Sequence, residues 1–415
     1  MNLNLFIAKK IKGKGLSSAS NTIALVSVAI SIAVIIIAVA ISDGFRKEIG
    51  KRAVGFSGEI LMTAPGMEYT NDIYPMDAGF SYMQDIRDLP EVESVSETAY
   101  KPGMVKSGSE VHGMVFKGVD STYSLDFFAD YLTEGRLPSF SGRRISDEVL
   151  VSVRFATMMG YGVGDRMDVY FVGEQVRVRR LTITGLYDIR LEDMDEMLAV
   201  ADIRQIRRLN GWTGHESSCV EIALKGDGTA SDPELRSRVA SRIGDIIMEK
   251  DCPEDDSVVV TTIDSVYPSL FDWLALLDLN VLVVMVLMIA VAGFNMVSGL
   301  LIILFEKISM IGLLKSLGMR TSSICRIFLY RGGAIVLKGV LWGNAVALLL
   351  LAVQKLFRPL SLNPVNYFVD FVPVDLDPVK IIVTDVASFI VLMLIMTIPS
   401  LFISKVSPDR TIKVS

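Results

Sequence analysis

Long uncharged runs constrain this chain more than any other feature of its sequence. Residues 22–41 and 279–305 contain no charged side chain, and residues 332–354 and 381–403 contain one each. About twenty residues in a helix are needed to cross the ~30 Å hydrocarbon core of a bilayer. The sequence therefore predicts four membrane-spanning helices.

The first run shares features with a cleaved signal peptide. Four lysines precede it, and Ala38-Val39-Ala40 resembles a cleavage site. Its uncharged core, residues 22–41, is nevertheless longer than the roughly 7–15 residues usual for such a peptide. We therefore expect this segment to be retained as a membrane anchor.

Lysine and arginine residues beside the spans predict the orientation of the chain. Such residues favour the cytoplasmic side of a membrane, and here they gather in residues 1–21, 306–331 and 404–415. These segments are predicted to be a cytoplasmic arm, a cytoplasmic insert between two spans, and a cytoplasmic tail. Residues 42–278 and the short loop 355–380 then lie on the opposite side.

The charges of the chain are segregated. Residues 46–278 hold 40 acidic and 25 basic residues, a net charge of −15, whereas the rest of the chain holds 7 acidic and 16 basic residues. Binding to nucleic-acid phosphates needs clustered bases on the polar domain itself. The acidic balance therefore argues against a nucleic-acid partner.

Within residues 42–278, strand-like and helical patterns follow one another, which is typical of an α+β domain. Strands are predicted at residues 59–63, 92–100, 111–119, 148–153, 166–171, 177–187, 197–200 and 219–224. Helices are predicted at residues 78–89, 154–159, 202–209 and 233–249, the last with Asp232 as N-cap and Pro233 in its first turn. A further helical pattern begins at Ile263 and continues towards the second span.

Known motifs for catalysis or metal binding are missing from the sequence. Its two histidines, His112 and His215, belong to no HExxH pattern, and no paired CxxC, GxSxG or GxxxxGK[ST] motif occurs. The acidic cluster Glu192-Asp193-Asp195-Glu196 is interpreted as a solvated loop rather than a cation site. Cys219 and Cys252 could pair, but three free thiols are the preferred interpretation. We expect no catalytic residue, metal or cofactor in this chain.

The cytoplasmic insert is predicted to form an amphipathic helix. At 100° per residue, one side carries Met310, Ile311, Leu313, Leu314 and Leu317. The other side carries Ser309, Gly312, Lys315, Ser316 and Arg320. Such a helix suits either an anionic lipid surface or a groove on a cytoplasmic protein, and composition alone leaves both open.

The insert resembles a motif of a known permease family. It reads Glu306-Lys307, Ile311-Gly312-Leu313-Leu314-Lys315, Gly318 and Ile324 to Phe328. This is similar to the "EK..IaiLK.lGa....I..iF" run of LolC and LolE, the permeases of lipoprotein-releasing ABC transporters. Other similar segments are SDGF (42–45), FKGVD (116–120), LTEGRLP (132–138), MMGYGVGDRMDVY (158–170), AVAGFNMVSGL (290–300), and residues 363–378 and 399–410. FtsX and MacB share the pattern more loosely.

This resemblance implies an α-helical membrane protein with four transmembrane helices and a large α+β periplasmic domain with a MacB-like core, inserted between helices 1 and 2. It implies a bacterial inner-membrane location, a second permease subunit that is the same chain or a paralogue, and a separate LolD-type ATPase dimer that holds ATP and Mg. The insert then transmits ATPase motion to the spans. The matching ATPase-coupling residues are Glu306, Lys307, Ile311, Gly312, Leu314, Lys315 and Gly318.

The substrate of this family is a lipoprotein taken from the outer leaflet of the inner membrane. The positions that match the periplasmic end of its first span are Asp43, Gly44 and Phe45, with Asp43 in place of the usual Asn. Adaptable apolar surface for acyl chains is predicted at Met285, Met288, Phe294 and Met296, and small residues that permit a crevice are Ser27, Ser31, Gly293 and Gly299. Ordinary helix packing is the alternative interpretation of these residues.

The resemblance leaves the chaperone and the exact role open. LolC-type members that bind a LolA-type periplasmic chaperone carry a long hook between two strands, whereas residues 169–181 predict a tight hairpin around Gly173. The chain is therefore expected either to be LolE-like, beside a partner with a hook, or to engage the chaperone differently. An FtsX-like signalling permease that controls a cell-wall hydrolase and a MacB-like efflux permease are alternative functions.

Overall fold

The computed structural model describes residues 16–400 except 68–73, 109, 174, 213, 215, 227–231, 251–256 and 364–366. The predicted cytoplasmic arm and tail, Cys252 and His215 therefore lie largely or wholly outside the described residues. The chain divides into two compact units. The helical unit comprises residues 1–45, 273–361 and 371–415, and the α+β unit comprises residues 46–272 and 362–370.

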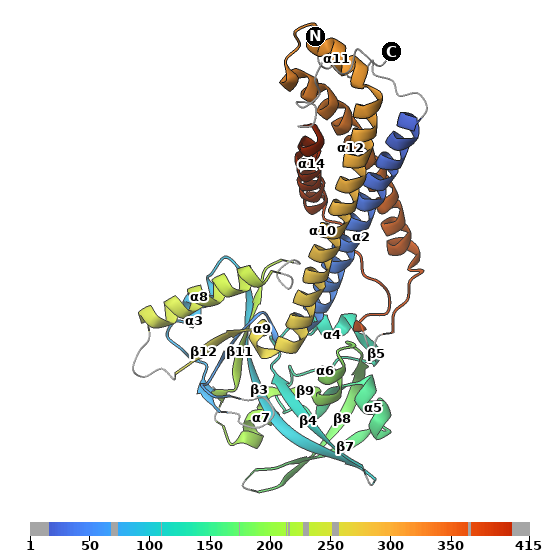
Figure 1. The fold of residues 1–415 in the computed structure, drawn as a ribbon. Coiled ribbons are helices and arrows are strands. Elements are labelled where there is room, and N and C mark those ends of the chain that lie inside the picture. Colours follow the sequence, from blue (N-terminus) through green and yellow to red (C-terminus); the bar gives the residue numbers. More distant parts are fainter. Residues whose placement is uncertain are drawn as a thin grey trace. The chain divides into compact units, whose positions relative to one another are not determined.

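Five helices carry the predicted spans and the insert (Figure 1). They are α2 (Leu16–Ser57), α10 (Pro268–Glu306), α11 (Ile308–Ser316), α12 (Thr321–Phe357) and α14 (Pro378–Ser400). All except α11 are long and apolar enough, by length and composition, to cross a membrane. Each long helix continues beyond at least one end of its predicted span, so the exact span boundaries and their sidedness stay predictions.

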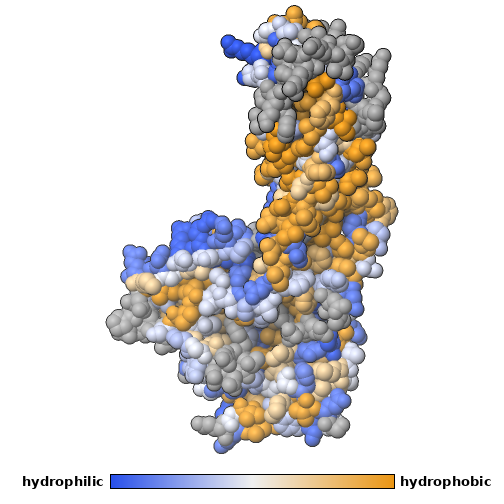
Figure 2. All heavy atoms as spheres, viewed as in Figure 1, coloured by the Kyte–Doolittle hydropathy of each residue, from blue (hydrophilic) through white to orange (hydrophobic). Residues whose placement is uncertain are grey.

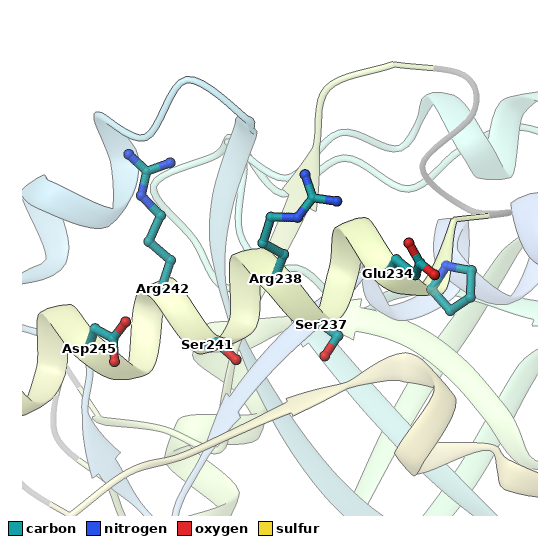
Figure 3. A pocket seen from close by; sticks show the side chains of 7 residues that line it. Glu234, Ser237, Arg238, Ser241, Arg242 and Asp245 are labelled. Carbon is teal, nitrogen blue, oxygen red and sulfur yellow. The ribbon is translucent and has the colours of Figure 1, made fainter.

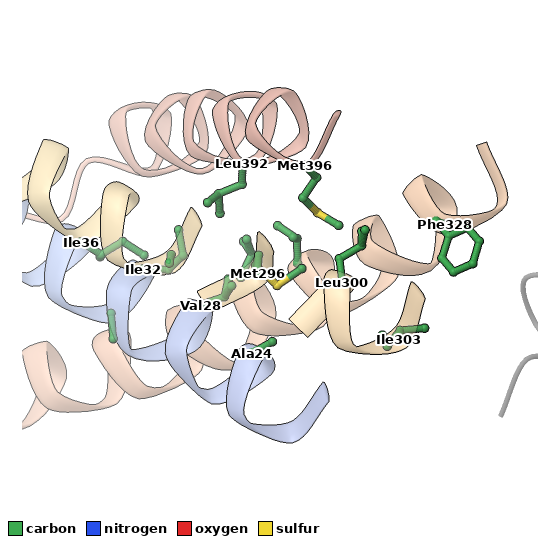
Figure 4. Close-up of a cluster of buried hydrophobic side chains, with 14 of the residues drawn as sticks. Ala24, Val28, Ile32, Ile36, Met296, Leu300, Ile303, Phe328, Leu392 and Met396 are labelled. Atoms are coloured by element: carbon green, nitrogen blue, oxygen red, sulfur yellow. The ribbon is translucent and has the colours of Figure 1, made fainter. Parts of the chain in front are cut away.

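A buried apolar cluster holds the four long helices together (Figure 4). It contains Val28 and Ile32 from α2, Met296 from α10 and Leu392 from α14, all at most 2% exposed. Glycines of α12 permit close approach to α2, because an added Cβ at Gly339 meets the Val28 side chain at 2.6 Å. Much of the outward surface of these helices is hydrophobic (Figure 2), as expected of helices that face lipid.

The α+β unit is built on a ten-stranded sheet. Its strands are β1 (Ile60–Thr63), β3 (Val92–Ser107), β4 (Glu110–Val119), β5 (Leu132–Gly135), β6 (Glu148–Ser152), β7 (Arg166–Phe171), β8 (Arg177–Tyr187), β9 (Leu198–Asp202), β11 (Cys219–Leu224) and β12 (Val259–Thr262). A separate two-stranded sheet pairs β2 (Met76–Asp77) with β10 (Glu216–Ser217). The remaining helices are α3 (Met83–Arg87), α4 (Asp126–Asp130), α5 (Val153–Met159), α6 (Glu192–Met197), α7 (Ile203–Asn210), α8 (Pro233–Lys250) and α9 (Ile263–Val266).

The long strand β3 belongs to two parts of the sheet. Its first half pairs with β11, which leads through β1 to the edge strand β12. Its second half pairs with both β4 and β7, and the ring β3-β4-β9-β6-β8-β7 closes into a barrel. Apolar side chains such as Val105, Phe116 and Val169, none of them exposed, fill the barrel. Helices α3 and α8 cover the open part, with Ile86 and Ile243 buried against it.

The sequence prediction of an α+β domain is confirmed in its main elements. The strands predicted at residues 166–171, 177–187 and 219–224 have the same bounds in the structure. The predictions missed β2, β5, β10, β12 and α4, and placed the end of β3 too early. The helical pattern from Ile263 is broken at Tyr267, so that α9 and α10 are separate helices.

The acidic cluster at residues 192–196 is not a solvated loop, and that prediction is wrong. The segment forms α6, and Asp195 is only 3% exposed. Its carboxylate accepts hydrogen bonds from the backbone N–H groups of Ile189 and Arg190, at 3.4 and 2.7 Å. These local bonds offset part of the cost of removing a carboxylate from water, which a count of charged residues cannot reveal.

Candidate functional site

The insert folds into a short helix with a well-defined end. Helix α11 stops where Gly318 adopts a left-handed conformation, with φ +82°. The Gly318 N–H donates to the Lys315 carbonyl and the Met319 N–H to the Leu314 carbonyl, each at 3.0 Å. This pair of bonds is a Schellman motif, in which glycine is favoured because it has no Cβ. Lys315 lies in the last turn, where a positive charge suits the helix dipole.

The buried side of α11 differs from the predicted one. Ile311 and Gly312 are buried, although Gly312 was placed on the polar side, whereas Leu313 and Leu317 are 58% and 75% exposed. Ile311 belongs to the same buried cluster as Ile324 and Phe328 of α12. The hydrophobic pattern could not show this, because contacts with α12 decide which residues of α11 are covered.

The charged residues at the start of the insert interact with each other. Lys307 Nζ forms an ion pair with Glu306 at 2.9 Å, and both side chains are only partly exposed. Of the seven predicted coupling residues, the structure buries Ile311 and Gly312, half-buries Leu314 and Lys315, and exposes Gly318. Leu313 of α11 and Leu317, directly after its end, are large apolar side chains that stay exposed, beside the exposed Ser309 and Ser316.

An apolar groove runs between α2 and α10. Its volume is about 420 Å³, and it is lined by Thr22, Ile23, Val26, Ser27, Ile30, Ser31, Met288 and Val291. Ser27 Oγ accepts a hydrogen bond of 2.6 Å from Asn295, which links α2 to α10 beside the groove. The groove lies between two helices of one chain, whereas the resemblance implies entry between the first span of one permease and the second span of its partner.

The predicted cavity residues of α10 do not all face this groove. Met288 lines it, Met285 is half-buried outside the lining, and Gly293 packs so tightly that a Cβ there meets Ile395 at 2.9 Å. Phe294 is 73% exposed, whereas Met296 is 2% exposed inside the bundle. Residues two positions apart in a helix point about 200° away from each other. Phe294 and Met296 therefore cannot line the same surface.

The SDGF segment fastens α2 to its neighbours in the helical unit. Ser42 donates to Asp278 of α10 at 3.1 Å, and Asp43 forms an ion pair with Lys380 of α14 at 2.7 Å. A Cβ on Gly44 would lie 2.5 Å from the Pro373 carbonyl oxygen, so only glycine fits there. Phe45 is 8% exposed and meets the Trp273 ring edge-on at 6.1 Å.

A buried ion pair in the α+β unit was not found from the sequence. Lys117 and Glu221 side chains are 0% and 4% exposed, and Nζ lies 2.7 Å from the carboxylate. Burial lowers the pKa of Lys117, but the Glu221 carboxylate and the Tyr123 hydroxyl outweigh it and raise the pKa above its ordinary value. For Tyr123, burial acts in the opposite direction and raises the pKa of the hydroxyl to about 12. Lys117 lies in the FKGVD motif, but nothing in the sequence indicated that this lysine is buried.

A second buried base, Arg52, holds the segment that joins α12 to α14. Arg52 is 7% exposed and donates to the carbonyls of Ile189 and Phe368, at 2.9 and 2.7 Å. Arg190 forms an ion pair with Asp370 in the same segment. Residues 362–370, predicted only as part of a periplasmic loop, are therefore an integral part of the α+β unit.

Other hollows and clusters carry less chemistry. The groove along α8 in Figure 3 has a volume of about 660 Å³ but is formed by one face of a single helix, from Pro233 to Asp245. One of its bases, Arg242, is engaged by Glu91 at 3.0 Å. Among the residues that the structure describes, no three His, Cys, Asp or Glu side chains are placed to hold a metal ion.

The hairpin predicted around Gly173 is confirmed. Strands β7 and β8 pair antiparallel with Phe171 opposite Arg177, so a short turn joins them. Residue 174 in that turn is outside the described part of the chain. The register leaves room for five intervening residues, 172–176, and no long insertion.

Comparison with known proteins agrees with this architecture. A family model described as "MacB-like periplasmic core domain" matches residues 22–242, which is more than half of the chain. The chain belongs to this family. A second model, "FtsX-like permease C-terminal", matches residues 282–408 of this family member.

Relatives of this family member include "Lipoprotein-releasing system transmembrane protein LolC" from Xylella fastidiosa, 22% identical over 90% of this chain and 88% of the relative. The corresponding LolE from Haemophilus influenzae is 22% identical over 89% of this chain and 88% of the relative. The periplasmic region of MacB from Actinobacillus actinomycetemcomitans aligns with 53% of this chain and 94% of its own, at 11% identity and a TM-score of 0.35. The resemblance to the LolC/LolE permease family, first noticed in the motifs, is thereby confirmed.

Proposed function

We propose that this chain is the permease subunit of an ABC transporter that extracts lipoproteins from the outer leaflet of the inner membrane for transfer towards the outer membrane. The observation that carries the proposal is α11, a short helix with two exposed leucines, set between two long apolar helices in a chain without a nucleotide-binding motif. Relatives named for lipoprotein release, matched over about nine tenths of the chain, support the substrate class.

Energy enters through α11 from a separate LolD-type ATPase dimer, which holds ATP and Mg. Leu313 and Leu317 fit an apolar groove on that partner, because exposed leucines on a charged, helical insert are costly in water. Only Lys307 separates α10 from α11, and buried Ile311 packs with α12 residues. A displacement of α11 therefore also displaces α10 and α12, because α11 is directly joined to the first and packed against the second.

The proposed topology follows the distribution of basic residues. The insert 306–331 and both termini are cytoplasmic, and residues 42–278 and 355–380 are periplasmic. A second permease subunit, either the same chain or a paralogue, completes the transporter. Membrane lipid surrounds the hydrophobic outer faces of the long helices (Figure 2).

The acyl chains of the lipoprotein are accommodated along α2 and α10. The apolar groove of about 420 Å³ between them supports this, since Met288 and the aliphatic residues around it offer adaptable surface. Asp43, Gly44 and Phe45 mark the periplasmic end of this path, and exposed Phe294 contributes to the lipid-facing side of α10. Met285 is half-buried and, nine residues before Phe294, lies on the opposite side of the helix. Met296 acts in packing instead, because it is buried in the bundle.

Transfer to a LolA-type chaperone depends on the partner permease. The turn between β7 and β8 is short, so we propose a LolE-like role beside a subunit that carries the hook. Capture of a chaperone by a complex containing only this permease, through the Gly173 turn, would contradict that assignment.

The test uses the complete complex in lipid nanodiscs. Leu317→Asp places a charge on a side chain that is 75% exposed, so folding is preserved. We expect lipoprotein release to fall at least about tenfold, because the ATPase groove cannot bind a desolvated carboxylate. Met248→Asp, at a position 84% exposed on α8, is the matched control and should leave release unchanged.

Two results would reject the proposal. One is normal release by the Leu317→Asp complex, and the other is the absence of any ATPase partner bound to the native protein. The match to the FtsX-like permease model favours a second candidate, a signalling permease. ATPase-coupled activation of a cell-wall hydrolase, without lipoprotein release, would favour that function, and export of a soluble compound would favour MacB-like efflux.

A further inference from the structure

The C-terminal end of α2 rests on the buried Lys117. Helix α2 ends at Ser57, and Gly58 follows with φ +75° and donates from its N–H to the Val54 carbonyl at 2.6 Å. The last carbonyls of a helix have no partner within the helix. Lys117 Nζ donates to one of them, the Phe56 oxygen, at 2.6 Å. A positive charge at this end also interacts favourably with the helix dipole.

Every donor of the Lys117 ammonium group has a partner. Besides the Phe56 oxygen, it donates to Glu221 at 2.7 Å and to the Tyr123 hydroxyl at 2.9 Å. The other Glu221 oxygen accepts from the Tyr100 hydroxyl at 2.8 Å and from Thr98 at 3.1 Å. The end of α2 is thus held by a directional network that tolerates little change in angle.

This network lies where the two parts of the sheet meet. Tyr100 of β3 pairs with Lys117 of β4 in the barrel, and Thr98 of the same strand pairs with Cys219 of β11 in the open part. Glu221 also belongs to β11. The end of α2 is therefore fixed to the strand that both parts share.

Energy alone does not explain a charged pair at this place. A buried ion pair often contributes no more stability than apolar residues of similar size, whereas its geometry is specific. Apolar side chains would let the last turn of α2 rotate about the flexible Gly58. Lys117 instead ties the Phe56 carbonyl to β4 through a directional hydrogen bond.

We propose that the Lys117–Glu221 pair is a positioning device that makes the junction between α2 and the sheet rigid, so that movement of α2 is passed to the α+β unit. This role rests on the proposed function, because the movement comes from the ATPase. Lys117 and Glu221 touch neither substrate nor nucleotide, and act through α2.

The first test measures the junction without transport. Spin labels are placed at Lys51, on the last turns of α2, and at Ser94, on β3; both positions are in the α+β unit, and both side chains are exposed. In the full-length protein we expect a narrow distance distribution. The double variant Lys117→Met/Glu221→Met leaves no unpaired charge, and we expect it to widen the distribution at least about twofold.

The second test measures coupling in the nanodisc complex. We expect the double variant to hydrolyse ATP at a rate within about twofold of wild type, but to release at least about tenfold less lipoprotein per ATP. Tyr123→Phe removes one hydroxyl and preserves packing. It should widen the distance distribution and lower release per ATP, each by a smaller amount than the double variant does. The control Arg180→Met/Asp168→Met removes an exposed ion pair on β7 and β8 and should change neither.

The outcomes separate this inference from the proposed function. A distribution as narrow as wild type in the double variant would show that the pair does not make the junction rigid. A widened distribution with normal release per ATP would show that rigidity is not needed for coupling. If the wild-type complex released no lipoprotein, the proposed function would fail, while the distance measurement would still decide the structural part.

Discussion

Removing Lys117 alone should destabilise the protein far more than removing the whole ion pair. Lys117→Met leaves the Glu221 carboxylate 4% exposed, with only the hydroxyls of Tyr100, Tyr123 and Thr98 as partners. It also leaves the Phe56 carbonyl without its buried donor. The variant therefore combines an uncompensated charge with a lost helix-end interaction.

The expected cost follows from these two losses. Breaking a buried ion pair by removing one partner costs about 3–5 kcal/mol, a large share of the roughly 5–15 kcal/mol by which a typical domain is stable. Lys117→Met/Glu221→Met removes both charges and leaves apolar side chains of similar length. Its free energy of unfolding should lie within about 2 kcal/mol of wild type, because such replacements are often neutral or stabilising.

Denaturant unfolding of the full-length protein in detergent micelles measures both values, with tryptophan fluorescence as the signal. Trp212 reports on the α+β unit, where it packs on the apolar core of the barrel. Equal losses of stability in the single and the double variant would refute the reasoning. The lost packing of the lysine methylenes, rather than an unpaired charge, would then dominate the cost.

Two further predictions concern a buried acid and a crowded glycine. Burial raises the pKa of Asp195 to about 7, so the folded state retains a proton that the unfolded chain, with a pKa of about 3.9, releases. Stability therefore falls as pH rises between these values. From about pH 5 to about pH 8, wild type should lose about 3 kcal/mol relative to Asp195→Asn, and parallel pH profiles would contradict this. Gly44→Ala should destabilise the protein by about 1–3 kcal/mol, because its Cβ meets backbone atoms of Pro373 and Val374 at 2.5–2.8 Å. Gly113→Ala, with no atom within 4 Å of the new Cβ, is the control, and equal melting temperatures for the two variants would refute the steric argument.

Features encoded by neighbouring residues could be predicted from the sequence. The four apolar helices follow from uninterrupted hydrophobic runs, which need no knowledge of distant contacts. Strands β7 and β8 have the predicted bounds because apolar and polar residues alternate along them. The end of α11 at Gly318 is likewise local, since a left-handed residue there favours glycine.

Features that depend on distant residues were decided only by the tertiary structure. The pattern of α11 predicted one apolar side that includes Ile311, Leu313 and Leu317. Contact with α12 decided that Ile311 and Gly312 are buried while Leu313 and Leu317 stay exposed. Lys117 looks in the sequence like a surface lysine, because its carboxylate partner Glu221 is 104 residues away. A charge can be buried only where folding brings its partners together, and the sequence alone does not show where that happens. The sequence by itself determined the helices, the strand pattern and the family motifs. The tertiary structure alone decided which of their side chains face the solvent and which hold the end of α2.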